Sequence, residues 1–309
     1  MTLSESETYT HPMANRGVVL AALSLAACAL AWPGTLVAQA VQRSMYVSVL
    51  DEAGAPVPDL GPADFVIRED NTAREVLKVV PAAEPMQIAL LVDTSQAARD
   101  DISHMRTALP PFVAALTAGK NEVSLIAIGE RPTVFTNYTT DPANLAKGIG
   151  RIWAMPDSGA YLLDAIVEVC QGFKKREASR PVIVSITTEG PELSNLHYQQ
   201  VLEPLRASGA AYHVITLGRP STSQSDEVRN RNIVLDEGPK TTGGSRDDLL
   251  TSMALDTRLL KLANELTHQY RVTYSRPQSL IPPERVTVAA AKAGLTARGT
   301  VIKEQQGRP

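Results

Sequence analysis

Apolar runs and amphipathic stretches alternate along the middle of the chain. Continuous apolar runs, typical of strands buried on both faces, occupy 87–92, 122–128, 181–187 and 211–217. Helical patterns occupy 98–117, 141–152, 160–176, 194–207 and 246–266. Strands that alternate with helices in this way are joined by crossovers and lie parallel. The pattern therefore predicts an α/β domain over 85–266, with a doubly wound, mostly parallel, Rossmann-like sheet.

Local signals refine this prediction at three places. Pro110 and Pro111 should kink or break the first helix, because proline removes a backbone donor. Ser194 is a candidate N-cap for the helix that follows it. Residues 219–245 are rich in Ser, Asp, Asn, Arg and Gly, which predicts a long surface loop.

Short alternating segments flank this region on both sides. Before it, strand patterns lie at 45–50, 64–68 and 75–80, and after it at 269–274, 285–289 and 295–302. An economical assembly pairs the two groups in a small β-sandwich-like domain. That domain is then made of residues 41–84 and 267–304, with the α/β domain inserted between its halves.

An apolar run near the start of the sequence precedes all of these elements. It extends from Gly17 to Trp32 behind a single cation, Arg16, and Ala38-Gln39-Ala40 follows it. An apolar core followed by small residues in the Ala-x-Ala pattern is typical of a secretory signal peptide. We therefore expect residues 1–40 to be a signal peptide and the mature protein to be periplasmic or extracellular.

Two questions about this segment stay open. The true start is either Met1 or Met13, because residues 1–12 contain acidic but no basic side chains. Cys28 follows Leu25-Ala-Ala, which is similar to a bacterial lipobox, so a lipid-anchored cell-surface protein is the alternative to a freely exported one. Membrane association is expected only if Cys28 carries lipid or the segment is retained.

Composition and motifs exclude several function classes. The net charge of −3 and the aromatic content of 5% do not favour nucleic acid as a partner. The histidines show no paired metal-ligand spacing, and no nucleophile elbow, Walker loop or dinucleotide fingerprint follows a predicted strand. His213, within an apolar run, is expected to be a core residue, and so is Cys170. The chain is therefore predicted not to be an enzyme.

Polar residues follow directly where the first predicted strand of the α/β domain ends. The sequence there is Asp93-Thr-Ser95-Gln-Ala97, after the apolar run 87–92. Ligands of open α/β sheets bind at the carboxyl ends of the strands. We therefore expect the functional surface at this edge of the sheet.

These residues and several other segments resemble one family, the von Willebrand factor A (vWA)-related domain proteins of environmental bacteria. Leu162-Leu-Asp-Ala-Ile166 is similar to the family's Leu-Tyr-Asp-Ala-Ile, and 182–190 to its strand that ends in Thr-Asp-Gly. The resemblance covers about residues 45–303 and includes the segments 47–65, 86–97, 242–244 and 266–270. It implies a Rossmann-like vWA fold, export, a protein partner and usually no enzymatic activity.

The resemblance also implies a metal site, of which this sequence retains only part. In the family, one loop supplies an Asp and two Ser, a second a Thr and a third an Asp to one divalent cation. Asp93 and Ser95 match the first two, but Ala97 and Ala160 carry no oxygen, and Glu189 stands at the third-loop Asp. Asp93, Ser95 and Glu189 could hold Mg²⁺ or Mn²⁺ weakly with added water. Otherwise Asp93 and Ser95 form hydrogen bonds within the loops.

The expected function is thus non-catalytic protein binding, in adhesion or scaffolding, without a cofactor. The expected binding face is formed by Asp93, Ser95, Ala97, Ala160 and Glu189. The alternative is a metal-dependent adhesion module that uses the reduced ligand set.

Overall fold

The computed structural model describes residues 40–219, 225–278 and 281–302. Residues 1–39, which include nearly all of the predicted signal peptide and Cys28, lie outside the described residues. Among the helices that the structure does describe, none is both long enough and apolar enough to cross a membrane.

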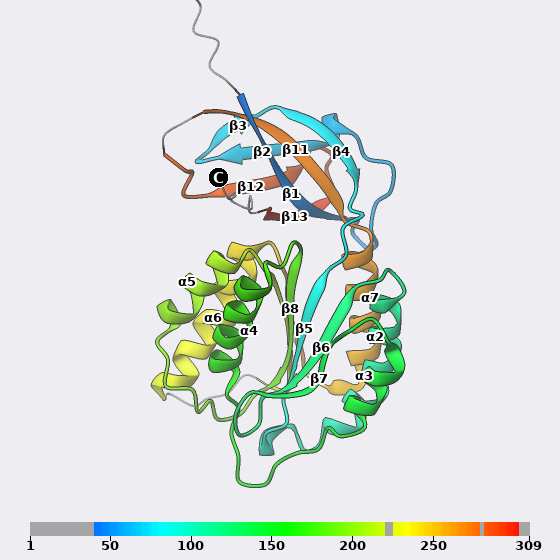
Figure 1. Cartoon of the computed structure of the whole chain (residues 1–309), viewed down its shortest axis with the longest axis vertical. Coiled ribbons are helices and arrows are strands. Elements are labelled where there is room, and N and C mark those ends of the chain that lie inside the picture. The colour runs from blue at the N-terminus through cyan, green and yellow to red at the C-terminus, as the bar shows by residue number, and fades with distance from the viewer. Residues whose placement is uncertain (1–39, 220–224, 279–280, 303–309) are drawn as a thin grey trace, which may run out of the picture. The chain divides into compact units, whose positions relative to one another are not determined.

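A six-stranded sheet forms the centre of the α/β domain (Figure 1). Its strand order is β10-β9-β8-β5-β6-β7, and every neighbouring pair is parallel except β6 and β7. The strands are β5 (Gln87–Val92), β6 (Glu122–Ala127), β7 (Thr133–Thr139), β8 (Pro181–Thr188), β9 (Ala211–Leu217) and β10 (Arg246–Leu249). The predicted fold class, a doubly wound and mostly parallel α/β sheet, is confirmed.

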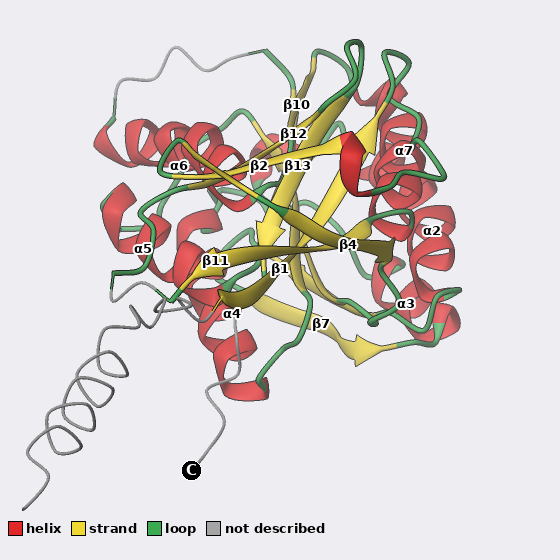
Figure 2. Ribbon diagram, turned by 90° about the horizontal axis from the view of Figure 1, so that it is seen from above, coloured by secondary structure: helices red, strands yellow, loops and turns green. Residues whose placement is uncertain are grey.

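Helices cover both faces of this sheet, as Figures 1 and 2 show. One face carries α2 (Ile102–Thr117), α3 (Pro142–Ile149) and α7 (Leu255–Thr267), and the other carries α4 (Leu162–Arg176), α5 (Tyr198–Ser208) and α6 (Asp226–Thr242). Side chains alternate across a strand, so β5 serves both cores: Ile88 and Leu90 face the α2 side, and Ala89 and Leu91 the α4 side. This double burial explains the unbroken apolar run in the sequence.

Strands from both ends of the described chain pair with each other. The sheet β13-β1-β11-β4 joins β1 (Ala40–Leu50) and β4 (Val76–Pro81) with β11 (Tyr270–Pro277) and β13 (Thr296–Val301). A second sheet, β12-β2-β3, joins β2 (Phe65–Glu69) and β3 (Thr72–Arg74) with β12 (Val286–Ala290). Buried residues of both sheets, among them Met45, Ile67 and Val272, form a third hydrophobic core. The α/β domain lies between these strands in the sequence.

The structure corrects the predicted loop at 219–245, because α6 occupies most of it. This helix is too polar for its periodicity to be read, and one of its fully buried positions is an arginine, Arg231. The predicted helix at 246–266 is also corrected: strand β10 comes first, then a short 3₁₀ turn (Ser252–Ala254), and α7 begins at Leu255. Strand β7 was missed, since it lies at the sheet edge and is only partly buried.

Two further corrections concern helix signals. Helix α2 does not break at Pro110 and Pro111 but continues to Thr117, so the predicted break is wrong, while the predicted kink stays a prediction. The carbonyl groups that these prolines leave without an intrahelical donor belong to Arg106 and Thr107, which are exposed, so water can hydrate them. The N-cap of α5 is His197, not Ser194.

Candidate functional site

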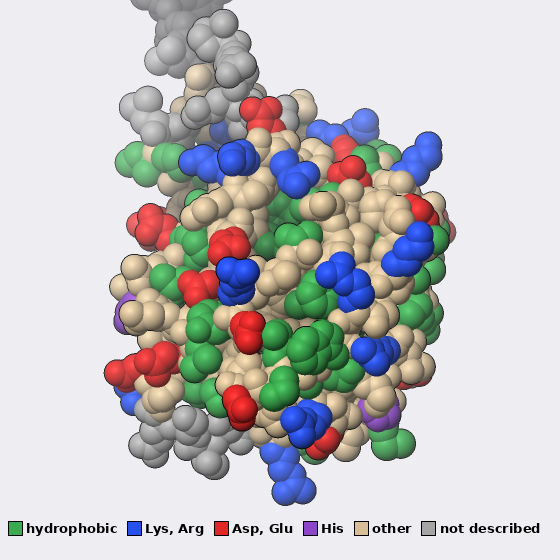
Figure 3. Space-filling model, turned by 60° about the horizontal axis from the view of Figure 1, so that its bottom comes forward, with side chains coloured by type: hydrophobic (Ala, Val, Ile, Leu, Met, Phe, Trp, Pro, Cys, Tyr) green, Lys and Arg blue, Asp and Glu red, His purple; other side chains and the backbone are tan. Residues whose placement is uncertain are grey.

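Three loops meet at the carboxyl end of the central sheet. We call residues 93–98 the first loop, 150–161 the second and 189–197 the third, and the surface that they form together the carboxyl face. Backbone hydrogen bonds join them: the amide of Met155 donates to the carbonyl of Thr94 (2.8 Å), and those of Ala160 and Leu193 close a bridge between the second and third loops (2.9 and 2.8 Å). The carboxyl face lies at the bottom of Figure 1 and comes forward in Figure 3.

Asp93 is buried at the centre of this arrangement, with none of its surface exposed. Its Oδ1 accepts a hydrogen bond from the Ser95 amide (2.8 Å). Its Oδ2 accepts from both the amide and the hydroxyl of Thr188 (2.9 and 2.6 Å). Both carboxylate oxygens are thus engaged within the protein, and Asp93 ties the first loop to the end of β8.

The remaining predicted positions of the first and second loops offer little to a ligand. Ser95 is buried, and its Oγ has no hydrogen-bond partner among the described residues. Ala97 is half-buried against Gly190, so closely that a Cβ atom at Gly190 would clash with the Ala97 methyl. Ala160 is buried. The structure brings these residues together with Asp93, but only Ser95 among the three carries a side-chain oxygen.

Glu189 is engaged by a residue that the sequence reasoning missed. Its Oε2 lies 2.8 Å from Nη2 of Arg231, which α6 supplies and which has no exposed surface. Nη1 of Arg231 also donates to the carbonyl of Gly190 (2.9 Å). The third-loop carboxylate is therefore paired with a cation that belongs to the protein. No signal in the sequence points to Arg231, because 42 residues separate it from Glu189.

This donor set does not fit a complete divalent-cation site. Magnesium requires oxygen ligands in near-octahedral geometry. Two ligand positions carry methyl groups, at Ala97 and Ala160, and Glu189 is bound to Arg231. Across the described ranges, no group of three or more His, Cys, Asp or Glu side chains is placed to hold a metal ion.

A second buried carboxyl group lies in the third loop and was also missed. Glu192 accepts a hydrogen bond from the Ser194 amide at Oε1 (3.2 Å), while Oε2 has no partner among the described residues. Burial raises the pKa of Glu192 to about 7, against the smaller opposing effects of the Ser194 hydrogen bonds and of Arg231. Ser194 also accepts a hydrogen bond from the Asp164 amide at its Oγ (3.1 Å), so it caps α4 instead of α5.

Exposed apolar side chains surround these buried polar groups. Trp153 in the second loop is 51% exposed, and Leu193 in the third loop is 46% exposed. Pro156 and Pro191, from the same two loops, are also exposed. Figure 3 shows hydrophobic side chains gathered among charged ones on this end of the molecule. The carboxyl face therefore presents large apolar side chains outward among exposed polar and charged ones such as Arg151 and Asp157.

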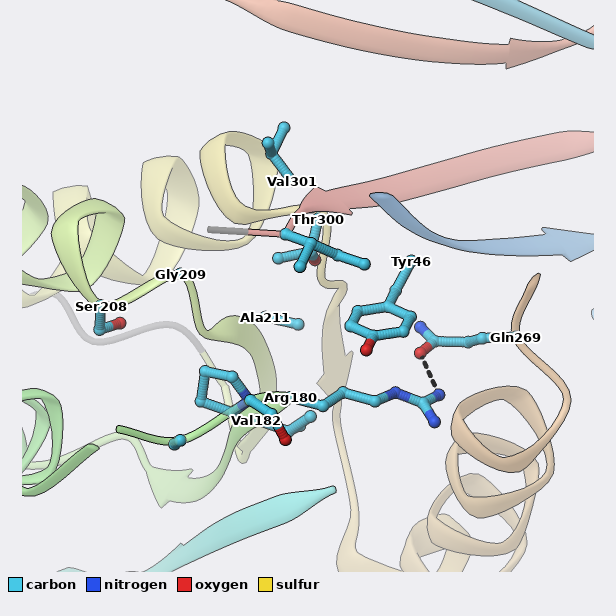
Figure 4. Close-up of a pocket in the computed structure, with 13 residues that line it drawn as sticks. Tyr46, Arg180, Val182, Ser208, Gly209, Ala211, Gln269, Thr300 and Val301 are labelled. Atoms are coloured by element: carbon cyan, nitrogen blue, oxygen red, sulfur yellow. Dashed lines mark hydrogen bonds between the residues drawn. The ribbon is translucent and has the colours of Figure 1, made fainter. Parts of the chain in front are cut away.

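A pocket lies at the amino end of the central sheet, opposite the carboxyl face, and contacts between the β strands and the α/β domain line it. Figure 4 shows Arg180 beneath Tyr46 in this pocket. The guanidinium lies 4.7 Å from the centroid of the Tyr46 ring. Arg180 also donates to the side chain of Gln269 (2.7 Å) and to the carbonyls of Glu84 and Leu266 (2.9 and 3.0 Å). These contacts fasten the β strands to the α/β domain.

Comparison with known proteins supports the family resemblance over part of the chain. Residues 88–190, from β5 to the third loop, match the family model of the von Willebrand factor type A domain. No curated protein matches the chain.

Solved structures show a similar arrangement at low identity. One is the conserved hypothetical protein BatB from Bacteroides thetaiotaomicron, with 14% identity, 60% of this chain and 98% of that chain covered, and a TM-score of 0.46. Another is the vWF domain of the type V pili tip protein Mfa5 from Porphyromonas gingivalis. It is 10% identical, the match covers 59% of this chain and 95% of that chain, and the TM-score is 0.46. A third is a von Willebrand factor type A protein from Catenulispora acidiphila. It is 11% identical, the match covers 86% of this chain and 73% of that chain, and the TM-score is 0.46. At these scores the likeness carries no argument about function.

Proposed function

Because the chain carries a von Willebrand factor type A domain, we propose that it is an exported, non-catalytic protein-binding module that acts in adhesion or scaffolding. Domains of this type are in general binding modules without catalytic activity and mediate protein–protein contacts. The proposed docking surface is the carboxyl face, and the proposed binding does not require a metal ion.

The exposure of Trp153 and Leu193 is the observation that carries this proposal. Both side chains are large and apolar, and both are about half exposed on loops that backbone hydrogen bonds hold in place. Contiguous exposed apolar surface on a soluble domain typically marks an interaction site, and tryptophan is enriched among the residues that dominate binding energy. Loops that are already fixed lose little conformational freedom when a partner binds.

Metal independence is supported by how the polar groups are used. Asp93 gives both carboxylate oxygens to hydrogen bonds within the loops, and Glu189 is paired with Arg231. The loops are therefore held together by contacts within the protein. A partner that binds here meets apolar surface instead of a bridging cation.

The proposed location rests on the sequence alone. The apolar run 17–32 and the Ala38-Gln39-Ala40 pattern favour export to the periplasm or the outside. A lipid anchor at Cys28 is the alternative, and mass spectrometry of the native protein would distinguish the two forms by the mass of the lipid.

A metal-dependent adhesion module is the competing proposal. One observation favours it: the Ser95 Oγ is buried beside Asp93 and has no hydrogen-bond partner among the described residues. A weakly held, hydrated Mg²⁺ or Mn²⁺ would satisfy that oxygen. On this proposal EDTA abolishes partner binding, and Asp93→Ala does the same.

Site-specific photo-crosslinking in producing cells tests the docking surface. A photo-reactive benzoylphenylalanine replaces Trp153 in one variant and Leu260 in the matched control, because Leu260 is 44% exposed on α7, away from the three loops. We expect a reproducible protein adduct at position 153 that is absent at 260 and that Leu193→Asp removes. Identical adducts at both positions, or adducts that survive Leu193→Asp, would refute docking at the carboxyl face.

A further inference from the structure

The guanidinium of Arg231 is fully buried, and its hydrogen bonds within the described residues go to four oxygen atoms, which we call its pocket. Nη2 contacts Glu189 Oε2 (2.8 Å) and Asn232 Oδ1 (3.2 Å). Nη1 contacts the carbonyl oxygens of Gly190 (2.9 Å) and Thr188 (3.5 Å), and Nε contacts Asn232 Oδ1 (3.4 Å). A carboxylate, an amide oxygen and two backbone carbonyls are the ligand types that calcium and manganese take in proteins.

Burial makes the positive charge in this pocket necessary. Arg231 has no exposed surface, and the Glu189 side chain is only 9% exposed. Removing one partner of a buried ion pair leaves an uncompensated charge, which is strongly unfavourable. A cation beside Glu189 compensates the charge of its carboxylate, and in this protein Arg231 supplies it from α6.

The pocket is also coupled to the first loop. Thr188 donates its amide and hydroxyl to Asp93, and its carbonyl faces Arg231. Gly190, whose carbonyl accepts from Arg231, lies against Ala97. Arg231 thus holds the backbone of residues 188–190, which in turn positions Asp93 and the first loop.

We propose that Arg231 is the resident cation of this protein: its guanidinium occupies an oxygen-lined cation pocket beside the carboxyl face, so the third loop is held without a divalent ion. Arg231 is a positioning residue, since it acts through Glu189 and the 188–190 backbone. The proposal does not rest on docking at the carboxyl face, because its test involves no partner.

Metal titration of the purified full chain and its variants tests this inference. Arg231→Met removes the guanidinium and leaves the oxygen atoms, so we expect it to bind Ca²⁺ or Mn²⁺, with a saturable rise in the unfolding midpoint of about 5 °C or more at 100 times the dissociation constant. Manganese binding is checked directly by electron paramagnetic resonance. The wild type and Arg231→Lys, which keeps a positive charge, should bind neither ion in millimolar solution.

A double variant separates metal capture from a general loss of structure. Arg231→Met/Glu189→Gln removes both charges, so it should fold and should not bind metal. If Arg231→Met is unfolded in EDTA, Ca²⁺ or Mn²⁺ should restore its near-ultraviolet circular dichroism. The inference is overturned if neither ion binds or refolds Arg231→Met, if the double variant binds metal equally well, or if the wild type binds metal while Arg231 is present.

Discussion

Glu192→Gln should change the pH dependence of folding stability in a defined direction. The unfolded chain protonates this carboxyl near pH 4.5, while burial raises its pKa in the folded protein to about 7. The folded state therefore binds the extra proton between these values. The resulting stabilisation is complete below pH 4.5 and is lost as the pH rises to 7.

The size of the effect follows from the two pKa values. At about 1.4 kcal/mol per tenfold change in proton concentration, a rise from 4.5 to about 7 corresponds to about 3 kcal/mol of lost stability at pH 8. Glutamine is neutral throughout, so Glu192→Gln removes this loss. Relative to the wild type, the variant should gain about 3 kcal/mol between pH 4 and pH 8.

Urea unfolding at each pH between 4 and 8 measures this difference. The wild-type curve alone does not reveal it, because burial lowers the pKa of His213 to about 4, and the two groups have opposite slopes between pH 4.5 and 6.5. The variant retains His213, so the difference between the two proteins isolates Glu192. Glu203→Gln, on the exposed side of α5, is the matched control against which the Glu192→Gln difference is compared. A flat difference for Glu192→Gln would refute the reasoning.

Three further predictions are measured by urea unfolding. Gly190→Ala should lower the free energy of unfolding by about 1–3 kcal/mol, because the new methyl group overlaps that of Ala97. Adding Ala97→Gly to this variant should restore most of the lost stability. In EDTA, Asp93→Ala should lower the free energy of unfolding by about 3 kcal/mol, because three hydrogen bonds are lost. Ser95→Ala should leave the free energy of unfolding unchanged or raise it by about 1 kcal/mol, because the Ser95 hydroxyl has no partner among the described residues. His213→Gln should remove about 3 kcal/mol of the stability loss between pH 6.5 and pH 4, where the imidazole is protonated in the unfolded chain but stays neutral in the folded protein. An unchanged loss of stability in acid would contradict this assignment.

The parts of the fold that the sequence predicts are those with a strong local signal. Strand β5 is buried on both faces, so its run of apolar residues is unbroken and its end at Asp93 is easily located. Strand β7 is half-exposed at the sheet edge and carries no such signal. Helix α6 has few apolar residues, and Arg231 takes a position where a periodicity argument expects an aliphatic side chain.

The sequence likewise predicts some features of the candidate site and not others. Asp93, Ser95, Ala97 and Ala160 come together because each follows or bridges a strand end of the parallel sheet, which the order of elements already implies. The order of elements does not predict which partners the side chains of the site contact or whether they are buried. Whether Glu189 faces solvent, a metal ion or an arginine depends on α6, and whether Glu192 is buried depends on how the second and third loops pair. These are tertiary facts with no local signature.

Ala97 and Ala160 offer no ligand oxygens to a cation, and Arg231 supplies a positive charge beside the same loops. A divalent cation at such a site would bind oxygens from several loops at once and so fix them relative to each other. In this protein Asp93 links the first loop to β8 by hydrogen bonds, the second and third loops pair through their backbones, and Arg231 holds residues 188–190. Methyl groups at positions 97 and 160 avoid the free-energy cost of burying an unpaired hydroxyl there. These contacts link the three loops within the protein, while Trp153 and Leu193 expose large apolar side chains on the carboxyl face.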